Sequence, residues 1–240
     1  MKKPHGDAES SEARGEETLR NLRGIPLQSR AALFIRHSAR EEGLTEDRNT
    51  SPEESWQLTP QGRVHARQFG RKIPPFAHLF LTHTRIARTR DTAEEIAAGV
   101  RETHPGSHVE MEGLDPALGL TTFYARDMAL RDHWKEKLGV QFYHGWLGGQ
   151  IPSNVLAPAE EAVADLVERY RTKIERSPES TLFLAVSHDV YIFAMREVLF
   201  GNRGSERPWI GYLDGVLLSW DPIGRLVARW RNETVPGVSE

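Results

Sequence analysis

The chain has 240 residues, of which 38% are hydrophobic and 27% are charged. This length and balance allow a sizeable core in one large domain or two small ones. The formal net charge of -3 does not indicate nucleic acid or a membrane surface as the main partner. The absence of cysteine excludes disulfides and thiolate chemistry. No apolar stretch approaches the length that spans a bilayer, and we expect a cytoplasmic protein whose oligomeric state the sequence does not indicate.

The N-terminal segment, residues 1–23, is polar and charged, with almost no apolar periodicity. A signal peptide needs an apolar region after its basic start, and the residues after Lys3 provide none. We therefore predict a flexible extension over residues 1–23 that lies outside the fold. The rest of the chain is predicted to form a single domain over residues 24–235, followed by a short tail over residues 236–240.

The first part of this domain alternates between a strand pattern and a helix pattern. Residues 31–35 are apolar and of strand length, and a polar loop over residues 41–57 follows them. A helix is then predicted with Thr59 as its N-cap and Pro60 as its first residue. Pro74 ends this helix, because proline cannot continue the helical hydrogen bonding.

The next elements repeat the alternation. A second strand over residues 77–82 precedes a helix that begins near Thr84 and carries apolar residues on one face. Residues 109–114 are predicted as a third strand. Residues 115–158 are irregular and rich in glycine and aromatic residues, so we predict a lid or insertion over the active face, with one helix over residues 125–138.

The last part completes the predicted sheet. A helix over residues 159–174 precedes a strand over residues 181–186, and a further helix, over residues 191–200, is strongly apolar. Residues 216–220 and 226–230 are predicted to form a hairpin. Strands that alternate with helices indicate a parallel sheet covered on both faces. The predicted fold class is α/β, a three-layer α/β/α sandwich with a mostly parallel central sheet.

Charged residues follow three of the predicted strands. They form segments 36–40, 83–89 and 187–189, with the sequences Arg-His-Ser-Ala-Arg, His-Thr-Arg-Ile-Ala-Arg-Thr and Ser-His-Asp. In a parallel sheet all three strand ends lie at the same edge, where open α/β sheets bind their ligands. We therefore expect two histidines, several arginines and one aspartate to meet in a single crevice.

This set of side chains fits the transfer of a phosphoryl group. Such a group spreads negative charge over three equatorial oxygens, and arginine guanidinium groups bind these oxygens bidentately while staying charged. Nearby arginines are expected to lower the pKa of His37, which keeps its ring neutral and nucleophilic. Attack by His37 gives a phosphohistidine, and an acid must protonate the leaving oxygen. No metal or cofactor is expected, because the guanidinium groups supply the positive charge.

The same residues resemble a known family, the histidine phosphatase superfamily, which includes phosphoglycerate mutases and histidine acid phosphatases. The resemblance covers roughly residues 33–215. Its anchors are Arg36-His37, the helix start from Leu58 to Gly62, Arg88-Thr89 with Thr92-Ala93, and Ser187-His188-Asp189. Each motif alone is weak, but together, in this order, they are specific. The resemblance implies a phosphoglycerate mutase-like fold.

The resemblance also implies a role for each matching residue. His37 is similar to the nucleophile that becomes phosphorylated, and Arg36 to its phosphate-binding neighbour. Arg88 matches a further phosphate-binding arginine, and His188 matches the second histidine, which binds the phosphoryl oxygens. Arg40 resembles an additional arginine of the acid-phosphatase branch.

Two features depart from the family pattern. Ser38 stands where the family usually has glycine, although a small residue is compatible with that position. The proton donor is ambiguous. Asp189 matches the acid of the acid-phosphatase branch, whereas Asp115 falls near the acidic residue of the mutase-like branch, four residues before Gly119. We predict Asp189 as the donor and keep Asp115 as the alternative.

The remaining predicted substrate-binding residues are Arg40, Arg85, Ser38 and His83. A metal site is the alternative for a chain with ten histidines. It is disfavoured because no His-x-x-x-His or Glu-x-x-His pair lies on a predicted helix.

The sequence therefore predicts a metal-independent phosphatase that hydrolyses a phosphate monoester through a phosphohistidine at His37. The expected substrate is a small phosphorylated molecule or a phosphoprotein, and neither nucleic acid nor a membrane is an expected partner. One alternative is a phosphoglycerate-mutase-like phosphotransferase, which needs a pocket that excludes water. Another is a non-catalytic module that binds phosphorylated ligands.

Overall fold

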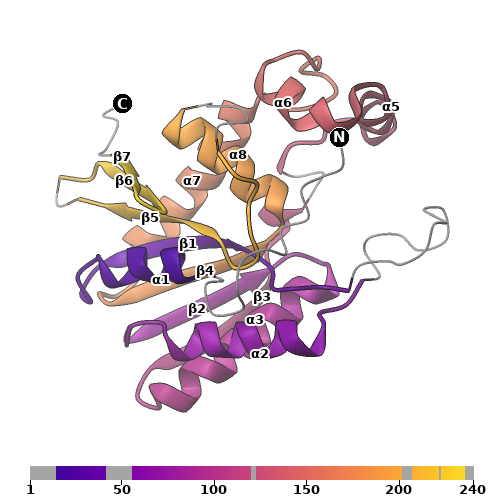
Figure 1. The fold of residues 1–240 in the computed structure, drawn as a ribbon. Helices are drawn as coiled ribbons and strands as arrows, with labels where there is room; N and C mark the ends of the chain where they lie inside the picture. The colour runs from indigo at the N-terminus through magenta and orange to yellow at the C-terminus, as the bar shows by residue number, and fades with distance from the viewer. Residues whose placement is uncertain (1–14, 42–55, 120–122, 202–206, 222, 236–240) are drawn as a thin grey trace.

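A computed structural model describes residues 15–41, 56–119, 123–201, 207–221 and 223–235 (Figure 1). Most of the predicted polar loop over residues 41–57, and the tail over residues 236–240, lie outside these ranges. In the part of the chain that the structure describes, no helix is long and apolar enough to cross a membrane.

A seven-stranded sheet forms the centre of the fold, in the order β3-β2-β4-β1-β5-β6-β7. Parallel ladders join β3 (His108–Leu114), β2 (His78–His83), β4 (Thr181–Ser187) and β1 (Arg30–Arg36). Antiparallel ladders add β5 (Gly215–Trp220), β6 (Leu226–Trp230) and β7 (Glu233–Val235). Since β6 opposes β5, which opposes β1, five of the seven strands run in one direction. The predictions of a mostly parallel sheet and a C-terminal hairpin are confirmed, and β7 is a short additional strand.

The register of the parallel strands brings the three charged segments to one edge. Arg36 pairs with Ser187 between β1 and β4, and His83 pairs with Val186 between β2 and β4. Directly beyond this register, the backbone N–H of His37 donates to the carbonyl of Ser187 at 2.9 Å. The residues that follow β1, β2 and β4 therefore lie side by side, as the strand-end pattern predicts.

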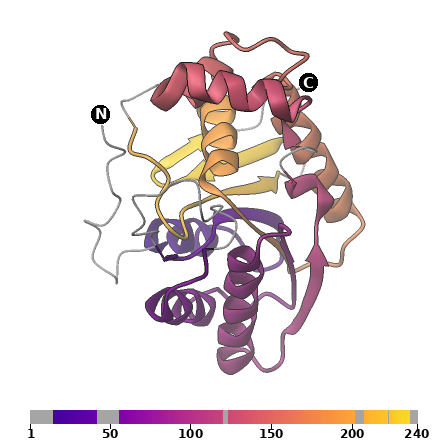
Figure 2. The ribbon, with the colours of Figure 1, turned by 90° about the vertical axis from the view of Figure 1, so that its right-hand side faces the viewer.

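Helices cover both faces of the sheet (Figures 1 and 2). On one face, Leu33 of β1 belongs to a core that includes α1 (Glu16–Arg23), α2 (Pro60–Arg71) and α3 (Ala87–Thr103). On the other face, the next residue, Phe34, belongs to a core that includes α7 (Ala159–Glu175) and α8 (Asp189–Phe200). Successive side chains of a strand point to opposite faces, so β1 is buried on both. This confirms the three-layer α/β/α architecture.

The N-terminal extension is shorter than the sequence predicts. Residues 1–14 lie outside the described residues, but α1 follows them, and its Leu19 and Leu22 are fully buried. The hydroxyl of Thr18 donates to the carbonyl of Leu213 at 3.1 Å, which joins α1 to the chain just before β5. The prediction of a flexible extension over residues 1–23 is therefore wrong for α1. Its apolar signal consists of only two leucines in a charged segment, yet both fill the core.

The insertion over residues 115–158 is more regular than the sequence predicts. It contains η2 (Pro116–Leu118), α5 (Met128–Leu138), η3 (Gly139–Gln141) and α6 (Phe142–Leu147). The predicted helix over residues 125–138 begins at Met128, because the Asp127 side chain caps it by accepting from the N–H of Leu130.

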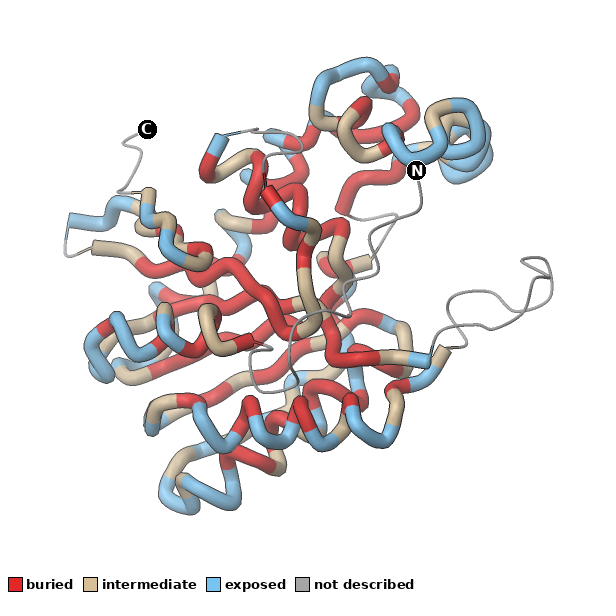
Figure 3. The backbone as a smooth tube through the Cα atoms, viewed as in Figure 1, coloured by how far each residue is buried: buried red, intermediate tan, exposed pale blue. Residues whose placement is uncertain are grey.

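The aromatic residues of this insertion extend the core that contains Phe34, α7 and α8. Phe123, Tyr124 and Trp146 are buried, and the ring of Phe123 stacks on that of Tyr191 at 4.5 Å. The rings of Tyr124 and Trp146 lie 4.6 Å apart. By contrast, α5 has no buried residue and stands at the outer edge of the molecule (Figure 3).

Candidate active site

The ring of His37 is held in one tautomer at the end of β1. Its Nδ1 lies 2.7 Å from the carbonyl oxygen of Ser38, and its Nε2 lies 3.0 Å from Nε of Arg88. A carbonyl only accepts and a guanidinium only donates, so Nδ1 carries the proton and Nε2 carries a lone pair. Burial holds the pKa of His37 well below 6.5, with further lowering by His188, Arg36 and Arg88. The predicted effect of the arginines is present, but burial is the larger cause.

The loop after His37 is tied by hydrogen bonds to α2 and α3. The backbone N–H of Ser38 donates to the Thr92 hydroxyl of α3 at 3.1 Å, and the Ser38 hydroxyl donates to the carbonyl of Gly62 in α2 at 2.7 Å. A Cβ at Gly62 would overlap the carbonyl oxygen of Ala39, so glycine is required for this close approach. The prediction that Ser38 binds substrate is not supported, because its hydroxyl is directed to the helix.

Arg88 lies between the two histidine rings. It is the second residue of α3, and the α3 N-terminus faces the carboxyl edge of the sheet. Besides the bond from Nε to His37, its Nη2 lies 3.4 Å from Nδ1 of His188. The two rings are 5.5 Å apart between centroids. Only 7% of Arg88 is exposed, so its charge acts in a largely water-free environment.

A chain of hydroxyl groups orients His188. Since Nδ1 accepts from Arg88, Nε2 carries the proton and donates to the Thr84 hydroxyl at 3.2 Å. The Thr84 hydroxyl lies 2.9 Å from that of Thr89, which donates to the carbonyl of Ile86 at 2.7 Å. Burial, followed by the charge of Arg88, lowers the pKa of His188 to about 3. Sequence reasoning used Thr84 only as a helix start and missed this contact.

Arg36 completes the cationic side of the site. Its Nη1 donates to the carbonyl of Ile210 at 2.6 Å, and its guanidinium carbon lies 4.2 Å from the centre of the Tyr212 ring. Its Nη2 is 3.7 Å from Oδ2 of Asp189. Its Nε–H is buried and has no hydrogen-bond partner among the described residues. A buried donor left unpaired is costly, so this N–H is suited to an anionic ligand.

The two candidate acids occupy different environments. Asp189 is the first residue of α8, its side chain is 27% exposed, and its Oδ2 accepts from Nε1 of Trp209 at 3.0 Å. Asp115 is only 6% exposed and caps η2 by accepting from the N–H of Ala117. The second oxygen of Asp115 accepts from the Tyr170 hydroxyl at 2.9 Å. Asp189 is therefore the candidate in direct contact with the cationic group.

Three predicted substrate-binding residues lie around this centre. Arg40 stacks on the Trp56 ring, with its guanidinium carbon 3.9 Å from the ring centre, and its charge contributes to the lowered pKa of His188. Arg85 is exposed and lies just before α3, two residues ahead of its first residue, Ala87. His83 ends β2, and its Nδ1 donates to the carbonyl of Thr84 at 2.7 Å.

Sequence reasoning missed the segment that contacts Arg36 and Asp189, which carries Trp209, Ile210 and Tyr212. These residues precede β5, and β5 pairs antiparallel with β1. The residues before an antiparallel neighbour lie at the carboxyl end of the strand it pairs with. A prediction that β5 pairs antiparallel with β1 would have placed this segment beside His37.

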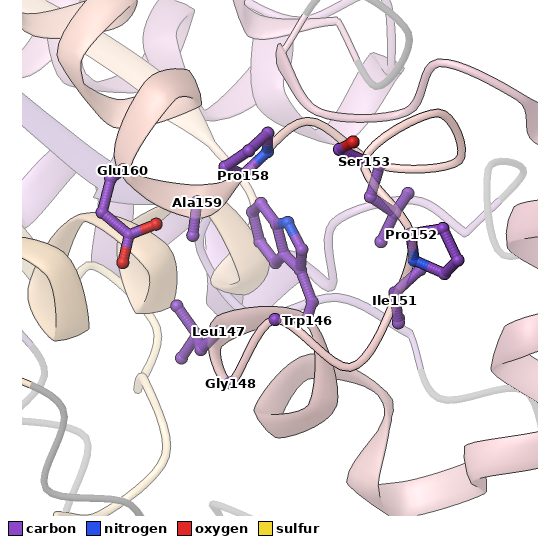
Figure 4. A pocket seen from close by; sticks show the side chains of 11 residues that line it. Trp146, Leu147, Gly148, Ile151, Pro152, Ser153, Pro158, Ala159 and Glu160 are labelled. Atoms are coloured by element: carbon purple, nitrogen blue, oxygen red, sulfur yellow. The ribbon is translucent and has the colours of Figure 1, made fainter.

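A separate cavity of about 490 Å³ lies in the insertion, between α6 and the start of α7 (Figure 4). Its walls include Trp146, Ile151 and Pro158, with Glu160 as the charged lining residue. No residue of the histidine site lines it. Within the described ranges, no group of three or more histidine or acidic side chains is placed to hold a metal ion, and metal independence stays a prediction.

The structure thus brings both histidines, Arg36, Arg88 and Asp189 into one centre, in which His37 and Arg88 are buried and the other three are partly exposed. The imidazole rings are neutral and the guanidinium groups are charged, so the centre has a net positive charge, and within the described ranges the Nε–H of Arg36 is available to donate. Such a centre can bind an anion with several oxygens and present a nitrogen lone pair to it.

Solved structures of known proteins share this fold. YhfR from Bacillus stearothermophilus has a TM-score of 0.55 at 15% identity, covering 87% of this chain and 98% of that one. A mycobacterial glucosyl-3-phosphoglycerate phosphatase has a TM-score of 0.52 at 17% identity, covering 86% and 100%. A phosphoserine phosphatase from Entamoeba histolytica has a TM-score of 0.51 at 15% identity, covering 88% and 98%. These likenesses establish the fold alone.

The family itself is shown by the sequence. No curated protein matches this chain. The family model of the histidine phosphatase superfamily (branch 1) matches residues 32–232, a range that contains His37, Arg88 and His188. This match confirms the resemblance seen in the motifs. The chain belongs to the histidine phosphatase superfamily.

Proposed function

We propose that this protein hydrolyses phosphate monoesters through a phosphohistidine at His37. The observation that carries the proposal is the state of the His37 ring. Its Nδ1–H is held by the carbonyl of Ser38, which leaves the Nε2 lone pair 3.0 Å from an N–H of Arg88. A neutral ring whose nucleophilic nitrogen faces a cation is the arrangement that attack on a bound phosphoryl group requires.

The phosphoryl group binds between His37 and the two arginines. On its arrival the Arg88 N–H turns from Nε2 to a phosphoryl oxygen, and the buried Nε–H of Arg36 donates to another. Charge-assisted bonds of this kind are about twice as strong as neutral ones. The negative charge of the ligand also favours a proton on Nδ1 of His188, which then donates to the group. Together these donors supply the charge that a metal ion supplies elsewhere.

In the first step, Nε2 of His37 bonds to phosphorus while the bond from phosphorus to the leaving oxygen breaks. The electron pair of that bond stays on the leaving oxygen, which takes a proton from the donor. We assign the donor to Asp189, because its carboxyl group lies beside Arg36 and is reachable from solvent. Asp115 is only 6% exposed, and its oxygens accept from the N–H of Ala117 and the hydroxyl of Tyr170, away from Arg36.

In the second step, water replaces the leaving group. Asp189 accepts a proton from the water, whose oxygen bonds to phosphorus, and the bond to Nε2 breaks with its electron pair returning to His37. The products are inorganic phosphate and the free enzyme. If a substrate hydroxyl attacks instead, the chain is a phosphotransferase of the mutase type. Hydrolysis is supported by two structural neighbours, the mycobacterial and Entamoeba histolytica proteins described above, which are both phosphatases.

The proposal is tested with H37A on a generic aryl phosphate, with a chelator present. We expect wild type to release phosphate under these conditions and H37A to lose at least about 1,000-fold in rate, since covalent catalysis has no substitute nucleophile. H108A is the matched control, because His108 is exposed and begins β3 at the opposite edge of the sheet. Labelled phosphate should be trapped on wild type but not on H37A. A wild-type rate in H37A would refute the mechanism, and loss of activity with the chelator would refute metal independence.

A further inference from the structure

The chain just before β5, residues 207–214, passes the carboxyl end of β1 and contacts Arg36 repeatedly (Figure 1). The backbone N–H of Arg36 donates to the carbonyl of Asp214 at 3.0 Å, and the N–H of Leu213 donates to the carbonyl of Arg36 at 3.1 Å. The guanidinium Nη1 donates to the carbonyl of Ile210. The 207–214 segment therefore binds both the backbone and the side chain of the residue that precedes His37.

Tyr212 supports the guanidinium group from one face. The guanidinium carbon of Arg36 lies 4.2 Å from the centre of the Tyr212 ring, well within the range of a cation–π interaction. The same ring lies 5.9 Å from that of His37. With its face on Tyr212 and its Nη1 on Ile210, the guanidinium has one defined orientation. In that orientation its Nε–H is buried and meets no acceptor in the part of the chain that the structure describes.

Trp209 holds the carboxyl group on the other side of Arg36. Its Nε1–H donates to Oδ2 of Asp189 at 3.0 Å, and the same oxygen lies 3.7 Å from Nη2 of Arg36. The indole stacks on Phe193 of α8 at 4.8 Å, and this packing sets the direction of its N–H. The Asp189 side chain therefore lies between an indole donor and a guanidinium group.

Ion pairs anchor both ends of the 207–214 segment. Arg207 is buried and pairs with Glu233 of β7 at 2.7 Å. At the other end, Asp214 is also buried and accepts from Arg231 at 2.8 Å. Because both ends are fixed, Tyr212 is held firmly against Arg36 and Trp209 against Asp189, and such support is what accurate placement of a functional group requires.

We propose that Trp209 and Tyr212 are positioning residues of the phosphate site. Tyr212 orients the guanidinium of Arg36 towards the phosphoryl oxygens, and Trp209 orients the carboxyl group of Asp189 towards the leaving oxygen. The inference rests on the proposed function, since it concerns groups of that same site. Each residue acts through its neighbour, so Tyr212 affects phosphate affinity and Trp209 affects protonation of the leaving group.

The role of Tyr212 is tested by the dissociation constant for inorganic phosphate, measured by calorimetry. Y212L removes the aromatic face and frees the guanidinium, so the dissociation constant should rise about tenfold. Y212F keeps the face and should restore the affinity to within about twofold of wild type. Wild-type affinity in Y212L, or an equal loss in both variants, would overturn this role. Y212M, which also lacks an aromatic face, replaces Y212L if thermal melting shows that Y212L does not fold.

The role of Trp209 is tested by the rates of a series of aryl phosphates with different leaving groups. W209F keeps the stacking on Phe193 but lacks the N–H donor. Its rate on the poorest leaving group should fall about tenfold more than its rate on the best, because good leaving groups need little protonation. W209Q supplies an amide N–H and should reduce the difference between the losses of rate on the poorest and the best leaving groups. W220F is the matched control, because Trp220 lies at the far end of β5.

General damage to the fold slows all of these substrates equally, so the leaving-group series separates positioning from structure. An equal slowing in W209F, or the same selective slowing in W220F, would contradict the role of Trp209. Failure of the proposed function gives a different result. If H37A keeps its activity, the phosphohistidine mechanism is wrong. The dissociation constants of Y212L and Y212F for phosphate still test the role of Tyr212 in that case. If H37A is inactive while Y212L and W209F match wild type, the function stands and the positioning inference is overturned.

Discussion

Replacing His188 with glutamine should remove part of the acid sensitivity of the fold. Burial, followed by the charge of Arg88, lowers the pKa of His188 from 6.5 to about 3 in the folded protein. Above 6.5 the ring is neutral in both the folded and the unfolded chain, so its titration contributes nothing. Below 6.5 the unfolded chain binds a proton that the folded chain does not, so the free energy of unfolding decreases as the pH falls.

The size of this effect follows from the two pKa values. The free energy of unfolding decreases by up to about 1.4 kcal/mol per pH unit in the window between about 6.5 and 3. At about pH 5, the loss from His188 alone is about 2 kcal/mol. That is a large share of the total stability of a typical domain, about 5–15 kcal/mol. His37 acts in the same direction, because burial holds its pKa well below 6.5.

Urea denaturation at about pH 7 and about pH 5 measures this loss. Wild type should lose about 2 kcal/mol more than H188Q between the two conditions. The comparison uses the difference between pH values, so any effect of the substitution at neutral pH cancels. H108Q is the matched control, because the side chain of His108 is 58% exposed and its variant should lose as much as wild type. Equal losses in wild type and H188Q would refute the buried, neutral state of His188.

Three further outcomes test other parts of the structure. D189N should slow poor aryl phosphates about 100-fold more than good ones, whereas D115N should show no such selectivity; the reverse pattern would make Asp115 the acid. G62A should cost about 3 kcal/mol in urea denaturation, because its Cβ overlaps the carbonyl oxygen of Ala39; an unchanged midpoint would contradict that close approach. L22A should cost about 3 kcal/mol, and an unchanged stability would place α1 outside the cooperative fold.

The elements that carry the two histidines are predictable because their signals are local. The apolar runs before Arg36 and Ser187 have the length of buried strands, and the carboxyl ends of parallel strands share an edge. The helix start at Thr59 is equally local, since the Thr59 hydroxyl accepts from the N–H of Gly62 at 2.9 Å as an N-cap should. The fold class and the meeting of the charged segments follow from such patterns.

The direction and burial of individual side chains depend on packing between distant elements, and local sequence patterns do not predict them. The hydroxyl of Ser38 is directed to Gly62 because α2 approaches the loop, and no pattern near Ser38 indicates that approach. Burial is the largest cause of the lowered pKa of both His37 and His188, whereas the sequence shows only the neighbouring charges. The burial of Leu22 in α1 likewise depends on the core that it meets, not on the charged segment that carries it.

The residues that orient Arg36 could not be predicted from the charged residues that follow parallel strands. The residues that follow parallel strands meet at one edge, so a search for charged residues after strands finds His37 and His188. On its other side, however, β1 pairs with an antiparallel strand, and there the residues that precede β5 reach the same edge. Trp209 and Tyr212 are aromatic rather than charged, and they stand before a strand rather than after one. In a mixed sheet, a site at a strand end is therefore built both from residues that follow parallel strands and from residues that precede an antiparallel strand. In this chain, the search for charged residues after strands finds only the first kind.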